Sequence, residues 1–460
     1  MMRMKLFFKK NIRIILTFFS VMFLQFVILR MGNQAGQGYL SEEKQEKVYI
    51  FLQLFMVGGI AAHILLCEFL KKNAVIRRIL MVAAGVSGIG AEFLLFSSPA
   101  SAVYLAVTYT TVFSLGLVVG AVYLRMAEYA SEKNNIGICM GIGYSAALLL
   151  QFVFQLTWQI VPVLAVLLPV SAVLSVIFLK ERQAPRLEET GVERIPLSGL
   201  LSSLAIAAAM LLFVSFYSGY IHHLQVATAY SEFNVYTWPR LLLIPGMLLF
   251  GCIGDLREGK YIPLASLCVS VVALLNAILV EKPGYYWLNM CLYYIALSAV
   301  IAYYNLTFWK ISLRSRHPAV WSVAGRVLDS ILVIPLCLIQ NSNISGSSIL
   351  SLNIAALIMI IVLMAVSGGF NLGGMVTEDF GTSYGGVKDP LTALGERFGF
   401  TPSEQRVFRE LVETEDKQVV IAERLSIKVR TVQANVTSIY RKTGVNTRSG
   451  LVQLYHSNRS

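Results

Sequence analysis

The sequence predicts an all-helical protein, with a polytopic membrane domain of twelve transmembrane helices followed by a small four-helix domain. The first observation is composition: 56% of the 460 residues are hydrophobic and only 14% are charged, whereas soluble domains carry about 25% charged residues. The second is a series of apolar segments of about 20 residues, the length that crosses a hydrocarbon core. The third is a polar tail with helical periodicity after residue 366. A soluble enzyme of this length is therefore not expected.

The apolar segments define a membrane domain over residues 1–366. The first segment follows a basic stretch, but no small-residue cleavage pattern comes after it, so we interpret it as an anchor and not as a cleaved signal peptide. A longer charged loop at 180–197 separates two six-helix halves, residues 1–180 and 197–366. The predicted spans are 12–30, 48–70, 79–97, 102–124, 136–156, 160–179, 198–220, 237–254, 262–280, 285–308, 319–339 and 347–366.

The distribution of basic residues predicts the orientation of these spans. With the N-terminus inside, the inner segments hold twenty Lys and Arg residues, and the outer segments hold four. Cytoplasmic loops are the ones enriched in Lys and Arg. Both termini are therefore predicted to be cytoplasmic, in a multi-pass membrane protein whose first partner is the lipid bilayer.

Span eleven carries two ionisable residues, Arg326 and Asp329. They lie about 10–15 Å along the helix from its inner end, near the bilayer midplane. Charged groups at this depth are costly, so each is a candidate site residue. Their i, i+3 spacing places them on one helix face. They form either a structural ion pair between helices or part of a pocket for a polar ligand, and the sequence leaves both interpretations open.

Three tyrosines of span ten are further candidates for a ligand site. Tyr293, Tyr294 and Tyr303 would line an aromatic cavity, although packing is the more common use of such side chains. Glu92 and Arg240, near the outer ends of spans three and eight, are interpreted as interfacial rather than ligand-binding. The six cysteines show no paired spacing, so neither a disulfide framework nor a metal site is expected. No cofactor is expected either.

The turn between spans eight and nine reads Gly251-Cys-Ile-Gly-Asp255-Leu-Arg257-Glu-Gly259-Lys260. It resembles the short Gly-x-x-x-Asp-Arg-x-Gly-Lys loop of the major facilitator superfamily, with one extra residue. In that superfamily an acidic group at one helix end and basic groups beside it hold neighbouring helices together. The resemblance implies a transporter-like fold for residues 1–366 and a structural role for Asp255, Arg257 and Lys260.

Composition changes after the last span. Residues 367–392 hold seven glycines and are predicted to form a flexible tether, with an end-to-end distance of about 28 Å if unstructured. Residues 393–460 are predicted to form a small helical bundle. Its first helix starts at Thr401-Pro-Ser-Glu404, a capping box with Pro at the first helical position. Further helices are predicted at 418–425, 429–442 and 447–456, in the order of a helix-turn-helix with flanking helices.

The predicted helix 429–442 has two contrasting faces. Its apolar stripe consists of Val432, Val436, Ile439 and Tyr440, at helical spacing. The opposite face has no carboxylate, and no acidic residue occurs after residue 426. Such a face fits the major groove of DNA, where Arg and Lys neutralise phosphates while Gln and Thr reach base edges; a solvated helix face usually mixes charge signs. The residues of this face are Arg430, Gln433, Ala434, Thr437 and Arg441.

The tail also resembles the LuxR/FixJ-type helix-turn-helix domain, over residues 400–456. The matching motifs are the Thr-Pro-Ser-Glu start, Ile421-Ala-Glu-Arg-Leu425, Thr431-Val432 and Ile439-Tyr-Arg-Lys-Thr-Gly444-Val, followed by Thr447-Arg448. In that family the third helix reads DNA and the fourth mediates dimerisation, which implies self-association of these domains on DNA. The resemblance implies base-facing positions for Gln433, Ala434 and Thr437, and phosphate-facing positions for Arg430, Thr431, Arg441 and Lys442.

The predicted DNA-binding set is completed by two further basic residues, Lys428 and Arg448. Two positions depart from the family pattern. Lys428 stands where a capping Ser is usual, which removes an N-cap, and Asn435 replaces the common His. Neither change removes the basic face.

The combined architecture resembles membrane-embedded LuxR-type regulators with twelve spans, in which a transporter-like domain acts as sensor. We therefore expect a one-component transcriptional regulator that senses an unidentified small molecule and binds promoter DNA. A secondary transporter with a regulatory C-terminal domain is the alternative, and a tail used only for protein–protein contact is a third possibility. The sequence contains no recognisable phosphate loop, paired catalytic carboxylates or nucleophile with a base, so enzymatic activity is not expected.

Overall fold

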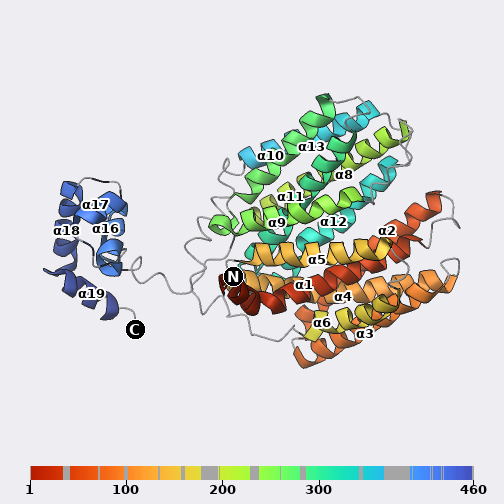
Figure 1. The fold of residues 1–460 in the computed structure, drawn as a ribbon, viewed down its shortest axis with the longest axis horizontal. Coiled ribbons are helices and arrows are strands. Elements are labelled where there is room, and N and C mark those ends of the chain that lie inside the picture. The colour runs from red at the N-terminus through yellow and green to blue at the C-terminus, as the bar shows by residue number, and fades with distance from the viewer. Residues whose placement is uncertain are drawn as a thin grey trace. The chain divides into compact units, whose positions relative to one another are not determined.

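The computed structural model contains two compact units, residues 1–381 and 382–460. Within the described residues, every regular element is a helix (Figure 1). The described residues are 2–34, 42–70, 73–97, 102–132, 135–156, 161–177, 195, 197–227, 238–259, 261–279, 286–340, 346–366, 394–395, 397–414, 416, 418–425, 427 and 429–457. The predicted tether at 367–392 lies outside them.

Each of the twelve predicted spans coincides in sequence with a helix of the larger unit. Its first half consists of α1 (Met2–Gln34), α2 (Glu42–Leu70), α3 (Asn73–Phe96), α4 (Ala102–Glu132), α5 (Ile136–Leu156) and α6 (Val161–Ile177). Its second half consists of α8 (Leu197–Ala227), η2 (Trp238–Leu242), α9 (Leu243–Asp255), η3 (Leu256–Gly259), α10 (Ile262–Leu279), α11 (Tyr286–Ser312), α12 (Pro318–Gln340) and α13 (Gly346–Val366).

Nine helices in the described part of the chain are long and apolar enough to cross a membrane, by length and composition. Two further helices are apolar but shorter, Pro162–Ile177 in α6 and Ile262–Asn276 in α10. Helix α12, which carries Arg326 and Asp329, belongs to neither group. The chain is therefore a multi-pass membrane protein, while the count of twelve crossings stays a prediction.

The helix contacts of the two halves repeat each other. In the first half, α1 packs against α4, α5 and α6, α2 packs against α4, and α3 packs against α4 and α6. In the second half, α8 packs against α11, α12 and α13, α9 packs against α11, and α10 packs against α11 and α13. These are the same pairings six spans later. The contacts between the halves also correspond. The α2–α12 contact becomes the α9–α5 contact when each helix is replaced by its counterpart in the other half.

The α5–α9 contact is a close approach of two backbones. A Cβ atom built on Gly137 would collide with the carbonyl oxygen of Gly251, and one on Gly141 would lie 2.6 Å from the carbonyl oxygen of Met247. Glycine is therefore required at these positions, because a larger residue would push the halves apart. This contact fixes the beginning of α5 against the end of α9, next to the turn that contains Asp255.

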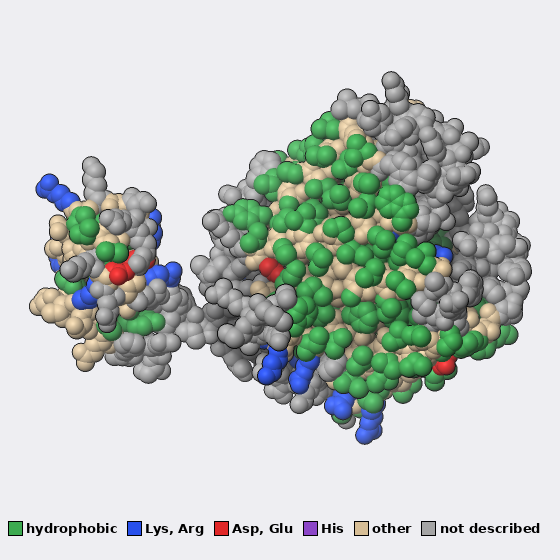
Figure 2. All heavy atoms as spheres, in the orientation of Figure 1, with side chains coloured by type: hydrophobic (Ala, Val, Ile, Leu, Met, Phe, Trp, Pro, Cys, Tyr) green, Lys and Arg blue, Asp and Glu red, His purple; other side chains and the backbone are tan. Residues whose placement is uncertain are grey.

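The surface of the membrane unit is the reverse of a soluble protein's surface. The exposed fraction is 80% for Phe69, 69% for Ile89 and 67% for Val82. Figure 2 shows a face of this unit that is covered by hydrophobic side chains, with few charged ones among its described residues. Polar side chains such as Gln151 and Asn305 are buried inside. Exposed apolar surface of this extent requires an apolar surrounding, which a bilayer supplies.

The smaller unit contains the helices α16 (Pro402–Glu413), α17 (Gln418–Arg424), α18 (Val429–Thr443) and α19 (Arg448–Ser457). The predicted capping box starts α16: the Thr401 N–H donates to Glu404 Oε2 at 2.6 Å, and the Glu404 N–H donates to Thr401 Oγ1 at 3.3 Å. Gly444 ends α18 with a φ of +73°, a conformation that favours glycine.

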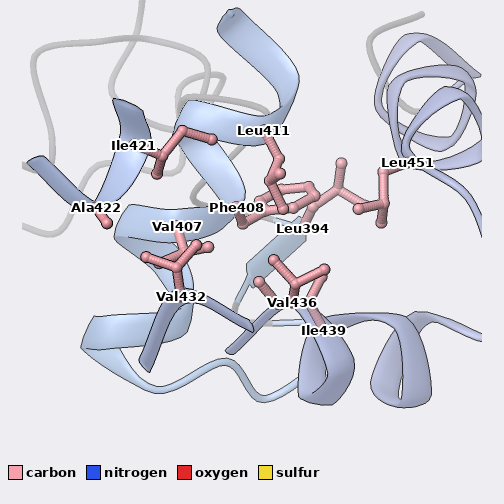
Figure 3. Close-up of a cluster of buried hydrophobic side chains, with 10 residues drawn as sticks. All are labelled: Leu394, Val407, Phe408, Leu411, Ile421, Ala422, Val432, Val436, Ile439 and Leu451. Carbon is pink, nitrogen blue, oxygen red and sulfur yellow. The ribbon is translucent and has the colours of Figure 1, made fainter. Parts of the chain in front are cut away.

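One apolar core holds these four helices together (Figure 3). Phe408 lies between side chains from α16, α18 and α19, and the predicted stripe residues Val432, Val436 and Ile439 enter the core from α18. Tyr440, the fourth predicted stripe residue, is only partly buried and packs against the same core. The fully buried members are Leu394, Val407, Phe408, Leu411, Ile421, Ala422, Val432, Val436, Ile439 and Leu451.

Candidate functional site

The outward face of α18 is the first candidate site. Helix α18 packs against α16 and α17 through its apolar stripe, so the remaining side chains turn to solvent. All six residues predicted for this face from Arg430 to Arg441 are exposed, and none is acidic: Arg430, Thr431, Gln433, Ala434, Thr437 and Arg441. The Thr437 hydroxyl donates to the carbonyl oxygen of Gln433 at 3.0 Å, which leaves the hydroxyl oxygen able to accept a further hydrogen bond.

Lys442 is partly exposed and forms its hydrogen bonds within the unit. Its Nζ donates to Glu404 Oε2 at 2.7 Å and to the carbonyl oxygen of Gly399 at 2.8 Å. The ammonium group thereby fastens the C-terminal end of α18 to the first turn of α16. The phosphate-facing position expected for Lys442 would require this ion pair to break.

Arg448 is likewise used within the unit. Its guanidinium donates to main-chain carbonyl oxygens at the end of α16 and in the segment after it, namely those of Leu411 (2.8 Å), Glu410 (3.4 Å), Thr414 and Asp416. Leu411 lies in the last turn of α16, where a helix leaves carbonyl oxygens without intrahelical partners, and Thr414 and Asp416 follow the helix. The structure therefore gives Arg448 a helix-capping role, and its predicted contact with DNA stays a prediction. Lys428 lies outside the described residues.

Glu404 is the buried charge that organises this end of the unit. Burial opposes its ionisation, but hydrogen bonds from Lys442, Ser438 and the Thr401 N–H outweigh that effect and lower the pKa of the carboxyl group from 4.5 to about 2. Beside it, the Asn435 side-chain amide donates to Ser403 Oγ at 3.0 Å. Asn435 thus helps to dock α18 on α16.

In the membrane unit, Arg326 and Asp329 form an ion pair on α12. Arg326 is 6% exposed, and the Tyr304 hydroxyl lies 3.4 Å from Asp329 Oδ2. Tyr304 comes from α11 and was not among the predicted ligand residues, although its neighbour Tyr303 was. The pair lies within α12 and does not join two helices; Arg326 is buried, whereas 28% of the Asp329 side chain is accessible. Both interpretations of the pair therefore stay predictions.

The predicted tyrosines occupy different surroundings. Tyr303 is 3% exposed. Tyr293 and Tyr294 contact each other, with ring centroids 5.0 Å apart, and Tyr293 also contacts Tyr217 of α8 at 6.2 Å. The Tyr217 hydroxyl donates to Asn289 Oδ1 at 2.9 Å. These contacts link α8 and α11 within the second half, and the ligand role of the three predicted tyrosines stays a prediction. Glu92 is half-buried on α3.

The Asp255 turn connects the two halves of the membrane unit. Asp255 Oδ1 accepts a hydrogen bond from the Gly137 N–H, and Oδ2 accepts one from the Ile138 N–H, both at 2.7 Å. These N–H groups belong to the first turn of α5, where a negative charge is favourable. Lys310 Nζ donates to the carbonyl oxygen of Gly254 at 3.0 Å. The Arg257 side chain and Lys260 lie outside the described atoms, so their predicted roles stay predictions.

A further polar contact between the halves was not predicted from the sequence. His317, just before α12, lies with Nδ1 3.0 Å from Glu68 Oε1, near the end of α2. Both this contact and the Asp255 contact lie at helix ends that the predicted orientation places on the cytoplasmic side. No sequence signal joins residues 68 and 317, because their proximity depends on the α2–α12 packing.

No family model matches the chain, and no curated protein matches it. Among solved structures, the chain is similar to the crystal structure of the human organic anion transporter MFSD10 (TETRAN), with 13% identity and a TM-score of 0.45. The match covers 80% of this chain and 97% of that chain. Among the described residues, no group of three or more His, Cys, Asp or Glu side chains is placed to hold a metal ion.

Proposed function

We propose that the protein is a membrane-embedded one-component transcriptional regulator. Its transporter-like unit would sense a small molecule, and its C-terminal unit would bind promoter DNA. The single observation that carries the proposal is the exposed, acid-free face of α18, on a helix whose opposite face is fixed in a packed core. A solvated helix face usually carries both acidic and basic residues. A helix that binds DNA instead carries basic and polar residues on the face that meets the phosphates and bases.

The spacing along α18 suits a major groove. Arg430 and Arg441 lie eleven residues apart, which is about 16 Å along a helix axis, and the groove is about 12 Å wide. The two guanidinium groups can therefore reach phosphates on both sides of the groove. Gln433 and Thr437, one turn apart between them, would face the base edges, where a Gln amide pairs with adenine N6 and N7.

The cellular arrangement is part of the same proposal. The excess of basic residues on the predicted inner side supports cytoplasmic termini in a bacterial inner membrane, which gives the C-terminal unit access to the chromosome. A tether at 367–392 would control the local concentration and pairing of the DNA-binding units rather than transmit a rigid rotation. Pairing on DNA would use α19. No catalytic activity or cofactor is included.

The test is DNA binding by the fragment 382–460, compared with matched variants. Arg430→Gln should weaken binding to all duplexes similarly and reduce the slope of log K against log salt by about 1. Gln433→Ala combined with Thr437→Ala should change the preferred sequence in a selection from random duplexes. Arg406→Gln, which removes an exposed charge from α16, is the control. Failure of the wild-type fragment to retain any duplex at low salt would refute the proposal.

A secondary transporter with a regulatory C-terminal domain is the second candidate. The observation that favours it is the buried Arg326–Asp329 pair in a fold of two repeated halves, because such halves can rock around a midplane site. The human structure named above is itself a transporter, in better agreement with this candidate than with a regulator. Uptake of labelled small molecules by proteoliposomes, abolished by Asp329→Asn, would establish it.

A further inference from the structure

Two arginines from different halves of the membrane unit converge near the predicted outer end of α5. Arg30 lies near the end of α1, and Arg240 lies in η2, just before α9. Their positive charges are close enough to repel each other. Among the described residues, no carboxylate lies within ion-pair distance of either guanidinium.

Two glutamines of α5 bridge the arginines. Arg240 Nη1 donates to Gln151 Oε1 at 3.2 Å. With the Gln155 amide turned so that its oxygen faces the donors, that oxygen accepts from Gln151 Nε2 (2.8 Å), Arg30 Nε (2.8 Å) and Arg30 Nη1 (2.9 Å). Gln151 is 1% exposed. The glutamines therefore orient both guanidinium groups, but as neutral side chains they do not compensate the charge.

An aromatic wall stands beside the bridge. Phe26, one turn before Arg30 on α1, lies under Arg240, with 5.4 Å from the guanidinium carbon to the ring centroid. The Tyr144 ring of α5 packs edge-on against Phe26, with 5.1 Å between centroids. Tyr144 is also within electrostatic range of Arg240, Arg326 and Asp329, so the bridge and the buried ion pair belong to one region.

Among the side chains that the structure describes in this region, the balance of charge is positive. Arg30, Arg240 and Arg326 contribute three positive charges, and Asp329 contributes one negative charge. Partly buried charges without a partner are costly, and guanidinium groups bind carboxylates and phosphates with two parallel hydrogen bonds. Arginines that only extend toward the membrane surface diverge from each other into water. These two instead meet on α5, where the repulsion between them must be offset.

We propose that Arg30 and Arg240, held by Gln151 and Gln155, bind an anionic ligand through its carboxylate or phosphate group, with the apolar part of the ligand against Phe26 and Tyr144. The proposal gives Arg240 a ligand-binding role in place of the interfacial one expected from the sequence. It names a ligand class for the sensing step of the proposed regulator, and it holds equally for a transporter because it rests on the membrane unit alone.

The test uses the full-length protein in nanodiscs and two kinds of probe. The soluble arm adds benzoate or inorganic phosphate to phosphatidylcholine nanodiscs and records the thermal unfolding temperature. The lipid arm compares phosphatidylcholine nanodiscs with nanodiscs that contain phosphatidylglycerol. We expect a saturable rise in the unfolding temperature in one arm, and that arm identifies the source of the anionic group. Absence of a saturable rise in both arms overturns the proposal.

Matched variants locate the effect. Arg30→Gln and Arg240→Gln should each weaken the apparent affinity for the active probe at least about tenfold, while Arg77→Gln, an exposed arginine on α3, should leave it unchanged. If a Gln variant does not fold, Arg240→Lys decides, because it keeps the charge but loses the planar fork; it too should weaken binding. Unchanged affinity in these variants overturns the proposal. Either result leaves DNA binding by residues 382–460 to be judged separately.

Discussion

In the C-terminal unit, Phe408 and Ile439 are buried and Gln433 is exposed, whereas in the membrane unit Phe69 and Ile89 lie outside and Gln151 is buried. Both units consist of helices, so secondary structure does not explain the contrast. The solvent does. Water drives the apolar stripe of α18 into a core, while lipid accepts apolar side chains on the outside of α2 and α3.

The contrast shows where each unit keeps its specific interactions. In the small unit, stability comes from one apolar core, and the polar face of α18 is exposed to water. In the membrane unit, lipid provides no such drive between helices, so close packing and buried polar contacts hold the halves together. The Gly137–Gly251 approach and the Asp255 hydrogen bonds to α5 are of this kind.

The largest expected effect comes from a cavity in the small core. Phe408 is 1% exposed, and Phe→Ala substitutions in cores cost about 3–5 kcal/mol. Because a domain of this size has a total stability of about the same magnitude, Phe408→Ala should unfold the fragment 382–460, as circular dichroism would record. Val419→Ala, at a position that is 53% exposed, is the control and should melt like the wild type. A folded Phe408→Ala fragment would contradict the core assignment.

A Val→Arg substitution should have different effects on the lipid-facing surface of the membrane unit and on the water-facing surface of the small unit. Val82 is 67% exposed near the middle of the span Ala74–Phe96, where an Arg costs about 2.5–3.5 kcal/mol if the surface faces lipid. Val82→Arg should therefore lower the yield of correctly inserted, monodisperse protein severalfold. Val419→Arg, on the water-facing surface of the small unit, should change stability by no more than about 0.5 kcal/mol. Equal effects at both positions would mean that Val82 does not face lipid.

Local sequence patterns were sufficient to predict the helices of both units. Thr401 and Glu404 predicted the start of α16 because a capping box involves residues only three apart. The stripe from Val432 to Ile439 predicted which face of α18 is buried, because helical periodicity is also local. The apolar segments predicted where the helices of the membrane unit lie, since their length is set by the hydrocarbon core.

Contacts between distant segments could not be predicted in this way. The Lys442–Glu404 ion pair joins residues 38 positions apart, and Gln151 meets Arg240 across 89 positions. The sequence showed each charged residue but not its partner. Lys442 was therefore expected to face DNA, and Arg240 was expected to lie at the membrane–water interface. Asp255 is an intermediate case, because the motif indicated a structural role, while its target at the start of α5 appears only from the packing of the two halves.

The smallest expected effect is a pH dependence in the water-exposed unit. Hydrogen bonds from Lys442, Ser438 and the Thr401 N–H lower the pKa of Glu404 from 4.5 to about 2 despite its burial. A carboxyl group whose pKa is lower in the folded state stabilises the fold above its unfolded pKa. This contribution, about 2 kcal/mol, should be complete above pH 4.5 and should disappear as the pH falls toward 2. Denaturant unfolding of the fragment 382–460 across this range measures it.

Glu404→Gln isolates this contribution from those of the other carboxylates. The variant should be less stable than the wild type at pH 7, because the amide accepts hydrogen bonds without charge, and the difference between the two proteins should shrink as the pH falls below 4.5. Arg406→Gln, at an exposed position of the same helix, is the control and should leave the pH dependence of stability unchanged. A constant difference between wild type and Glu404→Gln from pH 7 to pH 2.5 would mean that the charge of Glu404 does not stabilise the contact between α16 and α18. In the membrane unit, the Asp255 carboxylate accepts hydrogen bonds from main-chain N–H groups of α5. A carboxylate therefore joins two helices in each unit, although one unit faces lipid and the other faces water.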